Sequence, residues 1–319
     1  MSAQRFAIGV DIGGGSAKIG VVSSDGRILN TARLTNEAGA GGSGIVQSYV
    51  GAIKSLMISN SDCTIIGVGI GYPGIIHPDG RSGGLGNVPG LIDYPLAAAI
   101  EEATGLPCVV QNDANAAALA EAIFGDGKTS QRLLMVTAGT GIGLAFVANG
   151  KPVATSGGGL GDAGHMILDP NSGKRCRLGC RGCLEALASG EALNEVAAAF
   201  VCDFPDSKIG QNAIRKGRPA DASDIVECAI GGDESAVAIL AGAGCWIGRA
   251  VASWIHIFAP STVMIGGGLA IAGDALLVPL EGEARRCGLA DYLKDVTFIP
   301  ASLGNEAGIV GAAVPIFSA

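Results

Sequence analysis

The sequence predicts an α/β protein of two domains, each with a mixed sheet, that face one another across a cleft. The chain has 319 residues, a length that suggests roughly two domains. Its first half alternates strand and helix signals, and its second half opens, like the first, on a hairpin that turns at glycines. The two turns are Gly13-Gly14-Gly15-Ser16 and Gly139-Thr140-Gly141. This pattern indicates an approximate internal duplication, with a period above about one hundred residues.

The first half is expected to begin with three antiparallel strands, because turn residues separate its apolar runs. A hairpin at the first glycines excludes a Rossmann unit, in which a helix follows the glycines. The expected elements are strands at 6–10, 18–22 and 27–34, a helix at 44–57, a strand at 64–70, a loop at 71–90, a helix at 96–104, a strand at 107–111, and a helix that Asn112-Asp113 opens and that runs to about 124.

The second half is expected to start with another meander and to become helical from Leu184. Its expected strands lie at 133–137, at 142–149, from Lys151, and at 262–265, and a final helix begins near Asn305. The most apolar segment, 236–258, contains Arg249 and His256, and its longest uncharged piece falls short of the ~18 residues that a membrane helix needs. It is interpreted as a buried helix, with a transmembrane span as the alternative.

Composition indicates a folded, soluble chain. Hydrophobic residues make up 48% and charged residues 16%, which excludes a disordered chain. The net charge of −8 argues against nucleic acid or an anionic membrane as the main partner. The N-terminus has no apolar signal core, and nine cysteines without one suggest a reducing compartment. A cytoplasmic location is therefore expected.

The two glycine turns predict phosphate binding. Glycine lets the backbone approach a ligand closely, and successive N–H groups with a hydroxyl can bind anionic oxygens. One such loop alone would be read as an ordinary hairpin, but two at matching places favour phosphate. Neither fits the P-loop consensus. Lys18, on the following strand, could reach a phosphate or be a solvated strand lysine.

Two carboxylates lie where strands end. Asp11 precedes the first glycine turn and could hold Mg²⁺ through water, or be a turn-forming residue. Asp113 follows an apolar strand at the start of a helix, where it could act as the N-cap. The alternative is chemical: a carboxylate at a strand end can accept a proton from a substrate hydroxyl as a phosphoryl group arrives.

One histidine and three cysteines predict a closed zinc site. His165 is followed by Cys176, Cys180 and Cys183 at spacings that suit tetrahedral coordination. A redox pair or unbound thiols are the alternative. Basic residues surround the segment, so a zinc ribbon on nucleic acid is conceivable, but the acidic total disfavours it.

In chain order, a set of motifs resembles the ROK family of sugar kinases and repressors over nearly the whole chain. These motifs are Gly9-Val10-Asp11-Ile12-Gly13-Gly14, Gly69-Ile70-Gly71-Tyr72-Pro73-Gly74, Asn112-Asp113-Ala114-Asn115-Ala116-Ala117-Ala118, Gly139-Thr140-Gly141-Ile142-Gly143, Gly164-His165, Gly182-Cys183-Leu184-Glu185, Gly266-Gly267-Gly268 and Ala307-Gly308-Ile309-Val310-Gly311-Ala312-Ala313. Each motif is weak alone, and their order makes the set specific.

The resemblance implies the actin-like ATPase (ribonuclease H-like) fold. It implies an N-terminal domain of residues 1–118, completed by a C-terminal helix at about 304–319, and a larger domain of residues 119–303 with the zinc knuckle. It also implies transfer of the γ-phosphate of ATP, with Mg²⁺, to a hexose hydroxyl, commonly at position 6. A homodimer is expected from the resemblance, with no nucleic-acid or membrane partner.

The same resemblance implies residue roles. Asp113 matches the general base. Residues that match sugar contacts are Asn87, Asn112, Asp162, His165 and Glu185. The run from Gly266 resembles the family's adenosine-side loop. The residues predicted in all to contact the nucleotide or magnesium are Asp11, Gly13, Gly14, Gly15, Ser16, Lys18, Gly139, Thr140, Gly141, Gly266, Gly267 and Gly268. His165 is expected to contact sugar with one ring nitrogen and a structural Zn²⁺ with the other, beside Cys176, Cys180 and Cys183.

Three positions depart from the family pattern. Gly15 stands where the family usually has Thr, so the hydroxyl is expected from Ser16. Asp162 stands where Glu is usual, which leaves the sugar open. Leu178 occupies the usual place of a zinc cysteine, and Cys180 is expected to substitute through a rearranged knuckle.

Other functions stay open at this point. An N-acetylhexosamine or another hexose could be the acceptor, and polyphosphate could be the donor. A sugar-binding member without catalysis is a further possibility. A repressor of the same family would carry a DNA-binding module before the first strand, and the strand expected near residue 6 leaves no room for one.

Overall fold

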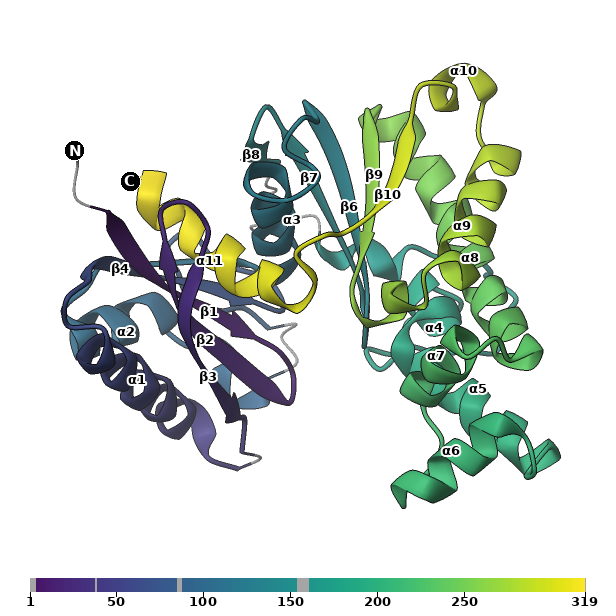
Figure 1. Cartoon of the computed structure of the whole chain (residues 1–319), viewed down its shortest axis with the longest axis horizontal. Coiled ribbons are helices and arrows are strands. Elements are labelled where there is room, and N and C mark those ends of the chain that lie inside the picture. Colours follow the sequence, from purple (N-terminus) through teal and green to yellow (C-terminus); the bar gives the residue numbers. More distant parts are fainter. Residues whose placement is uncertain (1–3, 38, 85–87, 154–160, 319) are drawn as a thin grey trace. The chain divides into compact units, whose positions relative to one another are not determined.

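The computed structural model describes residues 4–37, 39–84, 88–153 and 161–318 (Figure 1). The chain forms two compact units. Unit 1 comprises Met1–Gln131, Ala145–Gly161 and Ser302–Ala319, and unit 2 comprises Arg132–Leu144 and Asp162–Ala301. The domain limits expected from the sequence, 1–118 with 304–319 and 119–303, remain predictions.

The first sheet has the order β3-β2-β1-β4-β5. β1 pairs antiparallel with β2 and parallel with β4, so the sheet is mixed as expected. Its elements, with the helices of the same segment, are β1 (Arg5–Ile12), β2 (Ser16–Ser23), β3 (Ile28–Thr35), α1 (Gly41–Ser59), β4 (Thr64–Tyr72), η1 (Pro89–Leu91), α2 (Leu96–Thr104), β5 (Cys108–Asn112) and α3 (Asp113–Ile123), followed at the C-terminus by η4 (Gly304–Glu306) and α11 (Ala307–Ser318).

Helices cover both faces of this sheet (Figure 1). Alternate residues of β1, among them Ile8 and Val10, are fully buried in one cluster with Tyr49 and Ile53 of α1. Ala7, one position away, belongs to a second cluster on the other face with residues of α11. The period of two along a strand explains this division, because successive side chains point to opposite faces.

Helix α11 lies unusually close to the strands because glycines face it. A methyl group at Gly69 would overlap the backbone carbonyl of Ala312, and one at Gly9 would overlap that of Ile309. Gly311 of α11 is in turn pressed against the carbonyl of Ala116 in α3. The C-terminal segment therefore completes the core of unit 1 by backbone-to-backbone packing.

The second sheet has the order β10-β9-β6-β7-β8. The remaining elements are β6 (Arg132–Ala138), β7 (Ile142–Ala148), β8 (Lys151–Pro152), η2 (Gly161–His165), α4 (Leu184–Ala188), α5 (Gly190–Asp203), α6 (Lys208–Lys216), α7 (Ala222–Ile230), α8 (Glu234–Phe258), β9 (Thr262–Gly266), η3 (Gly268–Ala272), α9 (Asp274–Cys287), α10 (Ala290–Leu293) and β10 (Thr297–Pro300). Strand β10 was not predicted from the sequence; it has four residues and pairs parallel with β9. A strand this short has too few residues to display an alternating pattern.

Helix α8 is the one described helix long and apolar enough to span a membrane, and half of that stretch is buried within the protein. Its glycines bring it close to α9, since a methyl at Gly244 or Gly248 would meet backbone atoms of that helix. Arg249 pairs with Glu283 of α9 at 2.7 Å. These contacts support the interpretation of α8 as a core helix of unit 2.

We expect Gly69→Ala to lower the free energy of unfolding by more than about 2 kcal/mol, because the methyl has no room beneath α11. Gly51→Ala is the matched control. Gly51 is an exposed position inside α1 with nothing within 4 Å of the added methyl, so alanine should stabilise by about 0.5–1 kcal/mol. Urea unfolding of both variants measures the difference. Equal effects would contradict the close packing of α11.

Candidate functional site

In unit 1 the candidate residues gather where three parallel strands end. Asp11 of β1 is in register with Gly71 of β4, and Gly71 is in register with Gln111 of β5. Asn112 and Asp113 follow directly. Carboxyl ends of neighbouring parallel strands are where α/β sheets bind ligands. The fold thus brings the two predicted carboxylates, Asp11 and Asp113, to one edge of the sheet.

The carboxylate of Asp11 is largely buried. Burial raises its pKa above the ordinary value, and the ammonium of Lys18, whose Nζ lies 3.8 Å from Asp11 Oδ2, acts in the opposite direction. Gly308 of α11 faces this carboxyl group, which any larger residue there would displace. Lys18 Nζ also donates to the carbonyl of Asn305 at 3.3 Å. Lys18 Nζ therefore lies beside Asp11 and Asn305, and its side chain is about one-third exposed.

The first glycine turn is a tight hairpin. Gly13 N–H donates to the carbonyl of Ser16 at 2.9 Å, which closes the turn between β1 and β2. The Ser16 hydroxyl accepts from Arg33 at 3.4 Å. Nothing lies within 4 Å of a methyl group built on Gly15, so the space beside this residue is open.

Asn112, not Asp113, caps helix α3. Its side-chain oxygen accepts from Ala114 N–H at 3.0 Å and Asn115 N–H at 3.2 Å, and its amide donates to the carbonyl of Gly74 at 3.4 Å. The reading of Asp113 as the N-cap is therefore wrong. Asp113 is the first helical residue and is half-buried, with Oδ1 accepting from Ala114 N–H at 2.8 Å. Capping by its neighbour frees Asp113 from that structural duty.

The second glycine turn is held by helices α4 and α5. Gly139 N–H donates to the carbonyl of Gly141. At the start of α5, the N–H groups of Gly190 and Glu191 donate to the carbonyls of Gly139 and Thr140, at 2.7 and 3.2 Å. Because helix N-termini carry unpaired N–H groups, the loop satisfies two of them while α5 fixes its carbonyl directions.

Glu185 of α4 joins this loop to His165. One carboxylate oxygen, Oε2, accepts from Ile142 N–H at 3.1 Å, directly after the glycine turn. The other, Oε1, lies 4.0 Å from His165 Nε2. The side chain also fills the space beside Gly141, where a methyl group would overlap it. Two predicted sugar contacts are thus adjacent to each other and to the predicted phosphate loop.

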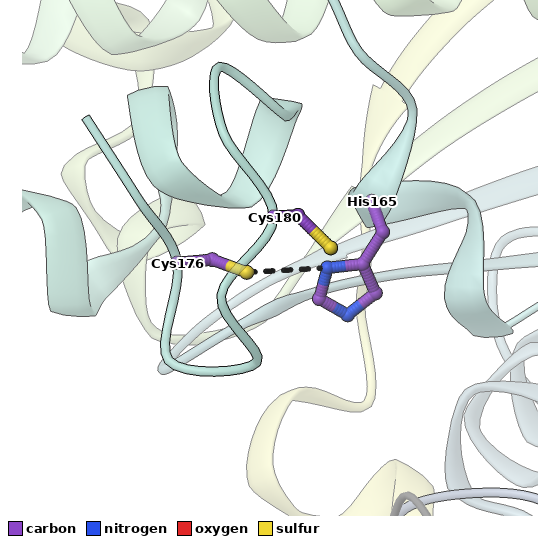
Figure 2. Close-up of side chains that lie close together, drawn as sticks. All are labelled: His165, Cys176 and Cys180. Atoms are coloured by element: carbon purple, nitrogen blue, oxygen red, sulfur yellow. Dashed lines mark hydrogen bonds between the residues drawn. The ribbon is translucent and has the colours of Figure 1, made fainter. Parts of the chain in front are cut away.

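The opposite ring nitrogen of His165 faces thiols. Figure 2 shows Cys176 and Cys180 directed toward His165, and Cys176 Sγ lies 3.6 Å from Nδ1. One ligand atom from each of the three residues lies within 4.8 Å of the others. Cys183 Sγ lies 4.0 Å from the same nitrogen and accepts from Ala186 N–H as the cap of α4. Burial, with the neighbouring thiols, raises the pKa of Cys183 to about 11.

A tight turn of residues 176–180, called the knuckle here, brings Cys180 to face Cys176. Cys176 N–H donates to the carbonyl of Cys180, and Gly179 N–H donates to that of Cys176, which closes a tight turn at a positive φ of Gly179. Leu178, at the usual cysteine position, is 46% exposed. His165, Cys176 and Cys180 bring an imidazole nitrogen and two thiols together, and Cys183 Sγ lies 4.0 Å from the same nitrogen. Thiols and imidazole are donors that zinc prefers. The residues present therefore fit the metal.

A cavity of about 430 Å³ adjoins the second glycine turn within unit 2. The loop that follows β9 closes one side, where Gly267 has a positive φ of 88° and lies against the carbonyl of Ala138. The residues around the cavity are Gly139, Thr140, Gly190, Glu191, Asn194, Asp221, Ala222, Ser223, Val226, Glu227, Ile230, Gly268, Leu269 and Ile271. Apolar walls with carboxylates and amides among them suit a flat heterocycle that carries hydroxyls.

Of the residues around this cavity, Gly139, Thr140 and Gly268 were predicted from the sequence, and Gly190 and the other walls were not. Ile230 and Ile271 are 61% and 62% exposed, which is unusual for such large apolar side chains. They lie in α7 and η3, where no motif marks them. Asp162 is exposed in η2, near His165 in sequence. Asn87, a predicted sugar contact, lies outside the described residues.

Comparison with known proteins identifies the family. A profile described as ROK family matches residues 7–316. The chain belongs to the ROK family. A glucokinase of Halalkalibacterium halodurans is 32% identical over 97% of this chain and 94% of its own length. The transcriptional repressor Mlc of Escherichia coli is 29% identical over 77% of this chain and 59% of its own.

Solved ROK structures show the same fold. A ROK family glucokinase from Streptomyces griseus, in complex with glucose and AMPPNP, superposes with a TM-score of 0.84 at 31% identity, covering 98% of this chain and 100% of the other. The predictions of the ROK family, of the actin-like ATPase fold and of a sugar-kinase enzyme are confirmed. The individual site residues remain predictions.

We expect Glu185→Ala to accelerate amide hydrogen exchange at Ile142 by about tenfold or more, because the N–H loses its carboxylate acceptor. Glu185→Gln keeps an oxygen acceptor and should stay closer to the wild type. Glu195→Ala, at an exposed position of neighbouring α5, is the control. Exchange measured over residues 139–146 tests this. Unchanged protection in Glu185→Ala would show that the carboxylate does not hold the loop.

Proposed function

We propose that the protein is an ATP-dependent hexose kinase that transfers the γ-phosphate to the 6-hydroxyl of glucose or a related hexose. The observation that carries the proposal is the 430 Å³ cavity of unit 2, which ends at the second glycine turn. Its apolar walls suit adenine, its acidic and amide side chains suit ribose hydroxyls, and the glycine turn suits phosphates. The S. griseus relative, solved with glucose and AMPPNP, supports the same pairing of ligands.

In unit 1, the proposal assigns chemistry to the two strand-end carboxylates. Asp113 acts as the general base that accepts the proton of the sugar hydroxyl. Its neighbour Asn112 caps the helix, and the second N–H of its side-chain amide is proposed to donate to a sugar hydroxyl. Asp11 would hold Mg²⁺, and Gly13, Gly14, Gly15, Ser16 and Lys18 would form the phosphate loop beside it. Magnesium, when bound, neutralises charge on the phosphates.

In unit 2, His165 and Glu185 are proposed to bind sugar hydroxyls, with Asp162 as a further contact. Asn87, which lies outside the described residues, is proposed as a sugar contact from the first half of the chain. Glu185 offers Oε1 and His165 offers Nε2 on the side away from the thiols. Gly139, Thr140 and Gly141 contact phosphate oxygens of the nucleotide. Gly266, Gly267 and Gly268 line the adenosine side. Phosphoryl transfer needs little covalent chemistry from the protein, so positioning and electrostatics should dominate the rate.

A structural Zn²⁺ is proposed at His165, Cys176, Cys180 and Cys183. Its binding fixes the ring and tautomer of His165, because Nδ1 must be free of a proton to coordinate. Nε2 then carries the proton and can donate it to Glu185 or to a sugar oxygen. The knuckle thus orients a sugar contact from the side opposite the sugar.

The nature of the acceptor and the donor are outcomes of the same assay. Asp162, one methylene shorter than the usual Glu, favours testing N-acetylhexosamines beside glucose, mannose, fructose and allose. If ATP supports no turnover with any of these sugars, polyphosphate is the next phosphoryl donor to test. Sugar binding without turnover would indicate a non-catalytic member. A homodimer is proposed from the family resemblance, and a cytoplasmic location from the nine cysteines and the lack of an apolar signal core.

Asp113→Asn should lower kcat by ~10²-fold or more in a coupled ADP-release assay with Mg-ATP and the best hexose. The affinity for that hexose, measured by calorimetry, should stay within about twofold, because the amide keeps the size of the side chain and can still hydrogen-bond a hydroxyl. Asp62→Asn, at an exposed loop of unit 1, is the control. Near-normal turnover of Asp113→Asn would exclude Asp113 as the base.

Metal analysis by mass spectrometry should find about one zinc per wild-type chain, and Cys176→Ser or Cys180→Ser should lose most of it, since thiolates supply most of the donor set. Cys202→Ser is the control, because that cysteine is exposed on α5 and remote from His165 in sequence. Full zinc content in Cys180→Ser would mean that Cys180 does not replace the cysteine missing at Leu178.

A further inference from the structure

Asn36, which no motif singles out, holds the first glycine turn at both ends. It lies directly after β3, beside the turn. Its backbone N–H donates to the carbonyl of Gly15 at 3.1 Å, and its side-chain amide donates to the carbonyl of Gly13 at 2.7 Å. A single residue thereby fixes two of the carbonyl groups of a loop made of three successive glycines. Such a loop has few conformational restraints of its own.

Tyr49 of α1 holds Asn36 in turn. The Tyr49 hydroxyl donates to Asn36 Oδ1 at 2.7 Å, and the ring is 1% exposed within the apolar core between α1 and the sheet. The direction of this relay is determined. The Gly13 carbonyl can only accept, so the amide nitrogen of Asn36 must face it, and the amide oxygen is left for the tyrosine O–H. Burial raises the pKa of Tyr49 far above its usual value, which keeps this proton in place.

Peptide planarity transmits the restraint to a donor. In a trans peptide the C=O and the following N–H point in opposite directions. Holding the Gly13 carbonyl toward Asn36 therefore directs the Gly14 N–H away from Asn36. Gly14 lies at the tip of the turn, which the proposed kinase uses to bind phosphate. The direction of that N–H is thus set by a buried hydroxyl on a helix that does not itself belong to the loop.

We infer that Tyr49 and Asn36 are positioning residues of the first glycine turn: the buried hydroxyl orients the Asn36 amide, and the amide orients the Gly14 N–H toward a nucleotide phosphate. This inference rests on the proposed function for the identity of the anion. The restraint on the loop is independent of it. The pair acts on nucleotide binding and phosphoryl transfer, and leaves sugar binding to other residues.

Tyr49→Phe removes one oxygen and keeps the ring in the core. We expect it to raise the KM for Mg-ATP or lower kcat by roughly 5- to 20-fold, the range of one to two hydrogen bonds. The affinity for glucose without nucleotide should stay within about twofold. Ile53→Val is the control, because Ile53 is fully buried on the same helix and its loss of a methyl costs comparable stability. It should alter unfolding without altering the kinetic constants.

Substitutions at Asn36 separate the hydrogen bond from the packing. Asn36→Ala should weaken the binding of Mg-ADP at least as much as Tyr49→Phe. Asn36→Asp should be no better than Asn36→Ala, because a carboxylate oxygen would face the Gly13 carbonyl, although Tyr49 could still donate to it. Wild-type affinity for Mg-ADP in both Tyr49→Phe and Asn36→Ala would overturn the inference.

Two readouts keep this test distinct from that of the proposed function. Amide exchange at Gly14, and binding of Mg-ADP followed by calorimetry, need no turnover. If the wild type phosphorylates no hexose, the kinase proposal fails, while faster exchange at Gly14 in Tyr49→Phe would still support the restraint. Unchanged exchange at Gly14 in an active enzyme would contradict the restraint alone.

Discussion

Unit 1 depends on the close approach of α11 to the sheet. Gly9 and Gly69 have no side chains, so the backbone carbonyls of Ile309 and Ala312 occupy the space that a side chain would need. Gly308, in the first turn of the same helix, leaves room for the carboxyl group of Asp11. A segment from the end of the chain thereby completes the core and shapes the surroundings of a strand-end carboxylate. Packing and the proposed chemistry share one set of small residues.

In unit 2, the glycine turn and the His165 segment are linked through Glu185. Its two oxygens serve Ile142 of the glycine turn and His165 of the knuckle, and the ring of His165 turns its other nitrogen to the cysteines. The thiols, the imidazole, the carboxylate and the second glycine turn therefore form one connected series within the unit. The zinc proposed here would act on sugar recognition through position alone, since no step of phosphoryl transfer passes through it.

Sequence periodicity was sufficient for most of the fold, because strands ending in glycine turns and one long apolar helix carry strong signals. It failed for β10, which is four residues long, and for the helix cap, since Asn112 and Asp113 are both good caps and only geometry separates them. The motifs marked glycines and carboxylates. They did not reveal Asn36, Tyr49 or the walls of the nucleoside-sized cavity, because those residues act through contacts between segments distant in sequence.

The most direct test of the account is the phosphorus NMR spectrum of the wild-type protein incubated with Mg-ATP and glucose. The account predicts that ADP and a sugar phosphomonoester appear in equal amounts, with the phosphate on the 6-hydroxyl and little inorganic phosphate, because the phosphoryl group passes directly to the sugar. Inorganic phosphate without a sugar ester, or no consumption of ATP with any hexose of the panel, would contradict it.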